Sequence, residues 1–492
     1  MSQVTGGTSA SLRLSRSGGG PLHTRVWVFL FLGWVVSYAD RTVTGPIVSW
    51  MISERAGFIG DAANPATIGG LVGSMFFTGY MLTQYAGGRL GDRFGHRDML
   101  VVSLVWAGLT TVLSGVVTGL VAFVAARVLT GLGEGVFYSN DRTLVIATTP
   151  PHRRTLGLGV VASGLTVGLT IGLVATPWLI DLGTAVGLGG HAWAMPLYVC
   201  GAATLVVGLL SRRFFTRESG RPLRLGRPAG RLALHSAPVF AAIVVLFLLS
   251  EEFGWPSWLT AVGSGVLAAL MIAWVVRQVS RENVRGTPGR ALLSRDAWLV
   301  YTAFIAVMWN LWFFSFWSVE IVREVSGSSL LTASLTAAFN AGAGIVGMPV
   351  GGWLADRQVR RGRGRKPLAI ACAAAHALLA AAFGLTIASG HPSLWMMGGV
   401  LFTAGLFFNA LQPIVHSITG DLVDAADRGS VFGIFNLVAE IGAVASPVVG
   451  GLLRDATGDW VLAVFVAAAV MAVSVVLYAL VREKAPAALQ PA

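Results

Sequence analysis

Long apolar stretches separated by short polar segments run through almost the whole chain of 492 residues. Each stretch is about 20 residues long, the length that a helix needs to cross a hydrocarbon core of about 30 Å. Helices are favoured in lipid because they satisfy their backbone hydrogen bonds internally. The pattern therefore predicts an all-α membrane protein with about 14 transmembrane helices. The expected spans are 26–50, 67–88, 99–117, 120–146, 156–181, 195–212, 237–252, 257–277, 297–319, 330–355, 367–388, 394–418, 429–453 and 460–482.

Composition agrees with a membrane protein, since 54% of the residues are hydrophobic and only 12% are charged. The first apolar stretch is too long for a cleavable signal peptide and carries charges. Residues 1–24 are rich in Ser and Gly and predict a disordered cytoplasmic tail, and 484–492 a short C-terminal tail. The two cysteines, Cys200 and Cys372, indicate neither a disulfide framework nor a metal cluster. We expect no cofactor, no bound metal and no enzymatic activity, and no nucleotide-binding loop is present to support ATP-driven transport.

The net charge of +12 is unevenly placed along the chain. Arginines crowd into alternate loops, such as 212–231 and 357–366, whereas the opposite loops hold few. This is the positive-inside pattern of membrane proteins, and it explains the basic balance without nucleic acid. It predicts a multi-pass protein of the cell membrane with both termini in the cytoplasm.

The chain repeats itself in two halves. The loop Gly88–Arg97 (GRLGDRFGHR) has an echo in Gly352–Arg357 (GWLADR). A known transporter architecture consists of two six-helix halves in parallel repeat, with the substrate site between them at mid-membrane depth. The predicted division is a six-helix bundle over 25–213, a basic linker over 214–295 that contains an extra hairpin at 237–277, and a second six-helix bundle over 296–483.

The repeated loop is a candidate cytoplasmic gate. Its glycines let helices approach closely, and an acid such as Asp92 can sit against a helix N-terminus or pair with an arginine of the loop. Breaking such a contact would let the cytoplasmic side open. A tight turn held by a salt bridge is the structural alternative. The candidate gate residues are Gly88, Asp92, Arg93, Arg97, Asp356 and Arg357.

Four charged side chains lie inside predicted spans: Asp40 and Arg41 in 26–50, and Arg127 and Glu134 in 120–146. A charge near the bilayer centre is costly, so such residues usually face a protein interior or a hydrated cavity. Arg127 and Glu134 are two helical turns apart and share one face, separated by about 10 Å. Asp40 and Arg41 diverge by about 100° around their helix. The pattern predicts an ionisable binding site between the two spans.

Several motifs resemble those of the major facilitator superfamily, and more narrowly of its anion:cation symporter family. That resemblance implies a fold of two six-helix bundles and transport of organic or inorganic anions, commonly carboxylates and sugar acids, often with protons. The inserted hairpin is instead similar to that of 14-span drug/proton antiporters. The motifs are the Gly88–Arg97 loop and its echo, Tyr38–Arg41, Arg127–Tyr138 followed by Pro150–Pro151, Gly433–Asn436, Ser446–Pro447 and Gly450–Gly451.

Arginine suits a carboxylate because its planar fork donates two parallel hydrogen bonds and stays charged, which makes Arg41 and Arg127 candidates to hold an anion. Substrate binding to an arginine would release the nearby acid and favour its protonation, and such linkage is reciprocal. The resemblance implies Asp40 and Glu134 as proton carriers. The alternative is that these acids and bases only neutralise one another across helices.

Further polar and aromatic residues inside the spans have two interpretations. The resemblance implies that Tyr38 and Tyr80 are cavity phenols that hydrogen-bond the substrate; ordinary packing is the alternative. The aromatic stretch 309–317 either lines a partly apolar pocket or contacts lipid and protein. Uncharged polar residues of the second half serve either ligand contact or interhelical hydrogen bonding. They are Asn310, Asn340, Asn409, Gln412 and Asn436.

Together these features predict a monomeric secondary transporter that moves a small organic anion, coupled to protons, by alternating access. One alternative is a 14-helix proton-coupled drug antiporter, which the hairpin favours and the two membrane arginines disfavour. A transporter-like sensor is the other, but it normally needs an output domain that 1–24 is too short to supply.

Overall fold

The protein is all helical in a computed structural model, which describes residues 22–149, 154–283, 294–390, 392–422 and 428–483. Residues 1–21 of the predicted N-terminal tail, the C-terminal tail 484–492, the Pro150–Pro151 motif and part of the basic linker lie outside these residues. The prediction of disorder up to residue 24 is wrong for 22–24, which begin the first helix. The helices are α1 Leu22–Ser53, α2 Gly57–Gly60, α3 Pro65–Phe94, α4 His96–Val116, α5 Leu120–Glu134, α6 Phe137–Thr148, α7 Arg154–Ala185, the 3₁₀ helix η2 Gly189–Ala194, α8 Met195–Ser219, α9 Gly226–Glu252, α10 Ser257–Asn283, α12 Arg295–Ser326, α13 Leu330–Arg360, α14 Lys366–Ala388, α15 Leu394–Asp421, α16 Arg428–Thr457 and α17 Val461–Leu480.

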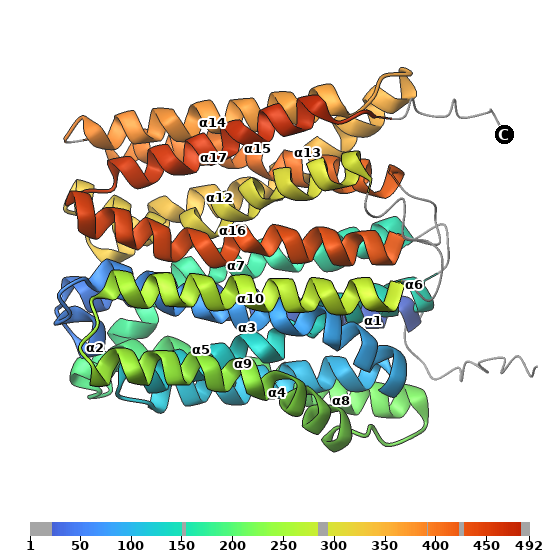
Figure 1. Ribbon diagram of the computed structural model, residues 1–492, viewed down its shortest axis with the longest axis horizontal. Coiled ribbons are helices and arrows are strands. Elements are labelled where there is room, and N and C mark those ends of the chain that lie inside the picture. The colour runs from blue at the N-terminus through green and yellow to red at the C-terminus, as the bar shows by residue number, and fades with distance from the viewer. Residues whose placement is uncertain (1–21, 150–153, 284–293, 391, 423–427, 484–492) are drawn as a thin grey trace, which may run out of the picture.

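Most helices are long and run side by side along the long axis of the molecule (Figure 1). Within the described residues, 13 candidate spans are long and apolar enough to cross a membrane, and α10 contains a shorter apolar stretch, Ser257–Met271. The prediction of an all-α membrane protein is confirmed. The expected total of about 14 spans is met when α10 is included with the 13.

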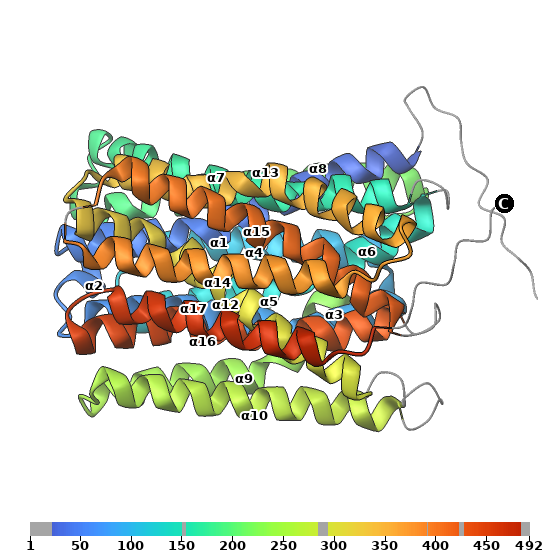
Figure 2. The same cartoon turned by 90° about the horizontal axis from the view of Figure 1, so that it is seen from above.

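The first helices (α1–α8) and the last helices (α12–α17) form two groups that lie beside each other (Figure 1). The hairpin α9–α10 lies along one edge of the molecule (Figure 2), where α9 contacts α3 and α5, and α10 contacts α3 and α16. Many large apolar side chains of this hairpin are exposed, as expected for a surface that faces lipid. The exact domain boundaries stay a prediction.

The span expected over 120–146 consists of two helices, α5 and α6, which meet at Gly135 and Val136. Glycines in this region let helices touch. A Cβ on Gly131 would overlap the backbone carbonyl of Phe76 in α3, so only glycine allows this approach. The close packing of α5 on α3 fixes the helix that carries Arg127 and Glu134.

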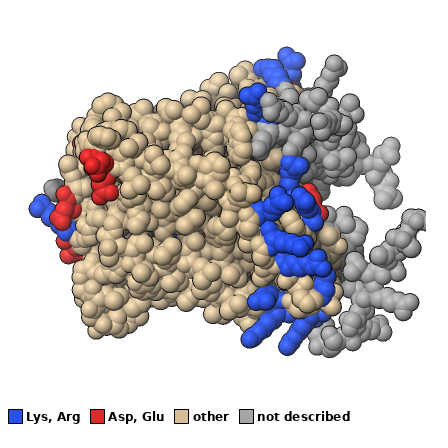
Figure 3. Space-filling view, turned by 60° about the horizontal axis from the view of Figure 1, so that its bottom comes forward, with Lys and Arg blue, Asp and Glu red and all other residues tan. Residues whose placement is uncertain are grey.

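The two ends of the bundle differ in charge. Most of the Lys and Arg side chains in view form a band near one end, and acidic side chains lie mainly at the other (Figure 3). We name the first end, where α3 and α8 end and α12 begins, the basic end. The opposite end, where α1, α12 and α16 end and α3 begins, is the far end.

Candidate functional site

Polar and charged side chains of α1 and of α5–α6 meet in a regular row. Trp34 Nε1 donates to Asp141 Oδ2 at 2.7 Å, and Arg41 Nε donates to Glu134 Oε2 at 2.6 Å. Trp34 and Arg41 are seven residues apart on α1, and their partners Asp141 and Glu134 are seven residues apart on the α5–α6 span. Seven residues are about two helical turns. Because both spacings match, α1 and the α5–α6 span present complementary groups at successive depths.

Arg127 and Asp40 form a second buried pair beside Arg41. Arg127 Nη1 lies 3.2 Å from Asp40 Oδ1, and Nη2 donates to the Asp40 backbone carbonyl at 3.4 Å. Both side chains are only 1% exposed. The guanidinium carbon of Arg127 also lies 4.9 Å from the centre of the Phe76 ring. The structure therefore brings the four predicted residues together and pairs each arginine with an acid of the other span.

Aromatic rings surround the Arg41 guanidinium. Its central carbon lies 4.7 Å from the centre of the Tyr38 ring and 4.2 Å from that of Tyr80. Ser37 Oγ accepts from Arg41 Nη2 at 3.3 Å and donates to Glu134 Oε2 at 2.6 Å. Rings that face a guanidinium stabilise its charge after desolvation. The two predicted phenols thus lie against the candidate anion-binding arginine.

The ion pairs leave polar atoms unused. Glu134 Oε1 and Arg127 Nε are buried and have no hydrogen-bond partner among the described residues. Buried polar atoms are normally paired, so such atoms mark places where a further donor or acceptor would be favourable. The cluster therefore has capacity for additional hydrogen bonds.

The second half contributes an acid that the sequence analysis did not single out. Glu440 of α16 is 5% exposed, and its Oε1 accepts from Gln84 Nε2 at 3.4 Å and from Asn436 Nδ2 at 3.5 Å. Asn436 also donates to Gln84 Oε1 at 2.7 Å. The signal was available, because Glu440 is a charged residue inside the predicted span 429–453. The criterion that identified Glu134 applies to it equally.

A small cavity lies between the halves next to this cluster. It has a volume of about 50 Å³, and its lining includes Tyr38, Thr166, Asn340, Asn409 and Gln412. One water needs about 10–15 Å³ of such space, so a cavity of this size holds only a few waters and is too small for a six-carbon acid. The structure shows the site in a contracted arrangement.

The uncharged polar residues of the second half fall into two groups. Asn340, Asn409 and Gln412 line the cavity, as a ligand-contact role requires. Asn310 instead donates to the carbonyl of Ala306 in its own helix at 2.9 Å and to that of Ala467 in α17 at 3.1 Å, so it bonds between helices and does not line the cavity.

The two halves also contact each other at the far end. Ser49 of α1 donates to the buried carboxylate of Glu320 in α12, and Arg323 donates to the Ser49 carbonyl at 3.2 Å. Glu320 is a second acid that the sequence analysis missed, because the predicted span 297–319 stops one residue before it and α12 continues to Ser326.

Helices α3 and α16 join the two halves at the far end as well. The backbone N–H and hydroxyl of Thr67 donate to Asp455 Oδ2, and the Val448 N–H donates to Ser74 Oγ at 3.2 Å. A Cβ on Gly70 would overlap the carbonyl of Pro447. The two helices approach so closely here that no side chain fits between their backbones.

The repeated loop motif is arranged differently from the expectation. The Asp92 side chain is 77% exposed and lies 3.4 Å from His96 Nε2, with no arginine partner among the described residues. The acid that ties this region together is Asp98, which was not predicted. It is fully buried and accepts from Arg221 Nη2 at 3.1 Å and from the Arg224 N–H at 2.7 Å.

The other candidate gate residues lie near the surface of the basic end. Gly88 packs beside Ser139 of α6, Arg93 is exposed and Arg97 is half-buried. In the second half, Arg357 is exposed and stacks on Trp353, while the side chain of Asp356 lies outside the described part of the chain. Their role in gating stays a prediction.

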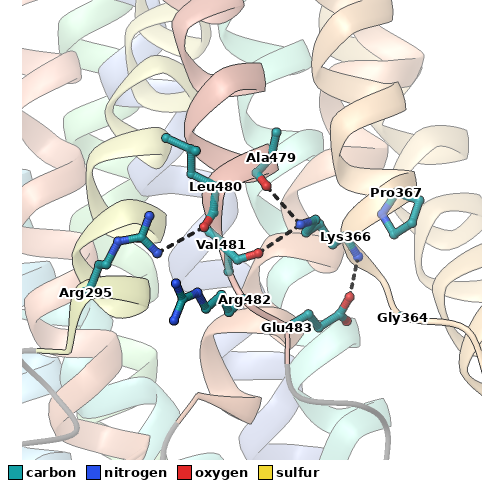
Figure 4. A pocket seen from close by; sticks show the side chains of 9 residues that line it. All are labelled: Arg295, Gly364, Lys366, Pro367, Ala479, Leu480, Val481, Arg482 and Glu483. Atoms are coloured by element: carbon teal, nitrogen blue, oxygen red, sulfur yellow. Dashed lines mark hydrogen bonds between the residues drawn. The ribbon is translucent and has the colours of Figure 1, made fainter.

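A larger hollow of about 590 Å³ at the basic end does not belong to this cluster (Figure 4). Lys366 Nζ donates there to the carbonyls of Ala479 and Val481, and Glu483 accepts from the Lys366 N–H at 2.9 Å. Arg295 donates to the Leu480 carbonyl at 3.3 Å. These bonds join the ends of α12, α14 and α17, so the hollow has a structural explanation.

Known proteins match this chain over nearly its whole length. A family model described as Major Facilitator Superfamily matches residues 30–386 and 361–492. A D-galactonate transporter of Escherichia coli O6:H1 is 23% identical over 88% of this chain and 89% of its own length. A hexuronate transporter of Bacillus subtilis (strain 168) is 25% identical over the same shares.

The fold is also found among solved structures. A bacterial homologue of the human lysosomal transporter Spinster, in an inward-facing and occupied conformation, superposes with a TM-score of 0.66 at 16% identity, over 94% of this chain and 97% of that one. The chain belongs to the major facilitator superfamily. It is a multi-pass membrane transporter and not an enzyme.

Proposed function

We propose that this transporter moves a small organic anion, a carboxylate or sugar acid, across the cell membrane together with protons. The observation that carries the proposal is the buried ion pair of Arg41 with Glu134, in which Arg41 Nε lies 2.6 Å from Glu134 Oε2. A guanidinium that binds a side-chain carboxylate can bind a substrate carboxylate by the same geometry. The D-galactonate and hexuronate transporters that match the chain support this class of substrate.

Competition for Arg41 would couple the substrate to a proton. A substrate carboxylate that takes the Arg41 donors leaves Glu134 buried without its cation, which is costly unless the acid binds a proton. By linkage, protonation of Glu134 would in turn free Arg41 and favour substrate binding. Asp40 and Arg127 form the neighbouring pair that would complete the coupling, with Tyr38 and Tyr80 as hydrogen-bonding walls.

Alternating access would expose this site to one side at a time. The far end is held shut by contacts of α1 with α12 and of α3 with α16. We infer that the halves separate first at the basic end to admit or release substrate. The contracted cavity must widen in that step, because it is smaller than any six-carbon acid.

The charge distribution supports an orientation. The band of Lys and Arg at the basic end (Figure 3) would face the cytoplasm under the positive-inside rule. This places both chain termini in the cytoplasm and the far end outside the cell. We propose that one chain forms a complete transporter, since each of the four site residues comes from the same copy.

Uptake into proteoliposomes tests the proposal. Arg41→Met should abolish uptake of an organic anion, because the substrate carboxylate then loses the guanidinium that binds it. Glu134→Gln should lose the accumulation of substrate that a lower pH outside the proteoliposomes drives. It should keep the exchange of labelled for unlabelled substrate. Arg454→Met, which alters a pair at the far end whose side chains are 26% and 33% exposed, serves as the control and should keep uptake. Normal proton-driven uptake by the first two variants would contradict the proposed site.

A further inference from the structure

Two buried arginines, Arg41 and Arg127, lie among three buried acids, Asp40, Glu134 and Glu440; the fourth buried acid of this region, Asp141, lies 3.9 Å from Arg142. Arg41 bonds to Glu134 and Arg127 bonds to Asp40, so both cations are already used. Glu440 has no cation bonded to it within the described part of the chain. A buried carboxylate without a cation is unfavourable, and the surplus therefore needs an explanation.

Glu440 is also incompletely hydrogen-bonded. Its Oε2 is buried and has no partner among the described residues, and its Oε1 receives only two long contacts, from the amides of Gln84 and Asn436. An ionised carboxylate accepts about four hydrogen bonds. Neutral amide donors at 3.4 and 3.5 Å do not compensate a full charge.

Glu440 and Arg41 face the same space from opposite halves. Arg41 belongs to α1 and Glu440 to α16, and neighbouring turns of α3 contact both: the centre of the Tyr80 ring lies 4.2 Å from the Arg41 guanidinium carbon, and Gln84 bonds to Glu440 at 3.4 Å. Arg41 can thus donate to a carboxylate, and Glu440, from the other half, can accept from a cation.

We propose that the substrate carries an ammonium group as well as a carboxylate, with Arg41 binding the carboxylate and Glu440 the ammonium. An amino acid or an amino sugar acid has this chemistry. A hydroxyl would supply Glu440 Oε2 with a hydrogen bond, but an ammonium supplies both the bond and the missing charge. Because Arg41 and Glu440 come from different halves, such a substrate would also draw the halves together. The inference rests on the proposed function, since it uses Arg41 as the anion-binding group.

Matched pairs of acids that differ only in one hydroxyl or amino group test the inference. Suitable pairs are D-gluconate with 2-amino-2-deoxy-D-gluconate, malate with aspartate, and phenyllactate with phenylalanine. Binding is measured on the purified full chain by thermal stabilisation and by competition in proteoliposome exchange. The amino member of at least one pair should bind about 10- to 100-fold more tightly, the range of a hydrogen bond to a charged group.

Variants of Glu440 assign that preference to the residue. Glu440→Gln should remove the preference for the amino member while the hydroxy member still binds, which shows that the variant is folded. Glu440→Asp keeps the charge and should keep part of the preference. Glu320→Gln changes another buried acid of the second half, at the far end, and should leave the ratio of affinities unaltered.

The outcomes separate this inference from the proposed function. If hydroxy acids bind and depend on Arg41, but amino members gain nothing or Glu440→Gln keeps their advantage, the ammonium site is wrong and the anion transporter stands. If no member of any pair binds, both proposals fail. Tighter binding of tetraphenylphosphonium, a cation without a carboxylate, than of every acid would also overturn both, in favour of a drug antiporter.

Discussion

Removing the guanidinium of Arg127 should destabilise the protein strongly, and restoring charge balance should reverse most of that loss. Arg127→Met leaves Asp40, 1% exposed, without its ion pair and without the bond to its backbone carbonyl. Breaking a buried ion pair by removing one partner typically costs about 3–5 kcal/mol. Replacing both partners by neutral groups of similar volume is often close to neutral. Asp40→Asn combined with Arg127→Met should therefore regain about 2 kcal/mol or more relative to the single variant.

Unfolding in mixed detergent and SDS micelles, followed by circular dichroism, measures these differences. Arg454→Met is the matched control, because its partner Glu324 is one-third exposed and such pairs contribute about 0–1 kcal/mol. The double variant should remain inactive in uptake even though it is stable. A single variant as stable as the control, or a double variant no more stable than the single one, would refute the reasoning about an uncompensated buried charge.

Three further predictions concern the ends of the bundle. Ser49→Ala should shift the halves toward opening at the far end, because buried Glu320 loses its donor, and spin-label distances between α1 and α12 should lengthen; unchanged distances would argue against this contact as a closure. Gly70→Leu should prevent closure against Pro447 and stop transport while the chain still inserts and folds, as seen by gel filtration and proteoliposome uptake; full activity would contradict the close approach. Asp98→Ala should lower the thermal unfolding temperature, since two donors at the basic end lose their acceptor, whereas Asp92→Ala at its exposed site should have little effect.

The spans were predictable because each must be long enough to cross the bilayer and must satisfy its backbone hydrogen bonds within its own helix. The partners of the charged residues were not, even though their positions were known. Spacing placed Arg127 and Glu134 on one face, but the tilt and rotation of α1 decide that Arg41 bonds to Glu134 and Asp40 to Arg127. Such choices depend on packing between helices that are distant in sequence.

Two buried acids were missed for different reasons. Glu320 lies just past the predicted end of its span, where hydropathy alone gives no sharp boundary. Glu440 was inside a predicted span and could have been found from its charge. Its contact with Gln84 of the first half, however, comes from the meeting of the two halves, which no local pattern encodes. Asp98 similarly obtains its partners from the distant segment after α8.

The seven-residue register between α1 and the α5–α6 span limits how the first half can be altered. Its contacts, Trp34 with Asp141 and Arg41 with Glu134, recur after about 10 Å of rise. A single residue inserted between Trp34 and Arg41 would rotate one contact by about 100° relative to the other. The two helices can then keep either the contact of Trp34 with Asp141 or that of Arg41 with Glu134, but not both. Loop grafts and fusion tags are therefore better placed outside this stretch, and a deliberate one-residue insertion there offers a way to disconnect the two levels without changing any charge.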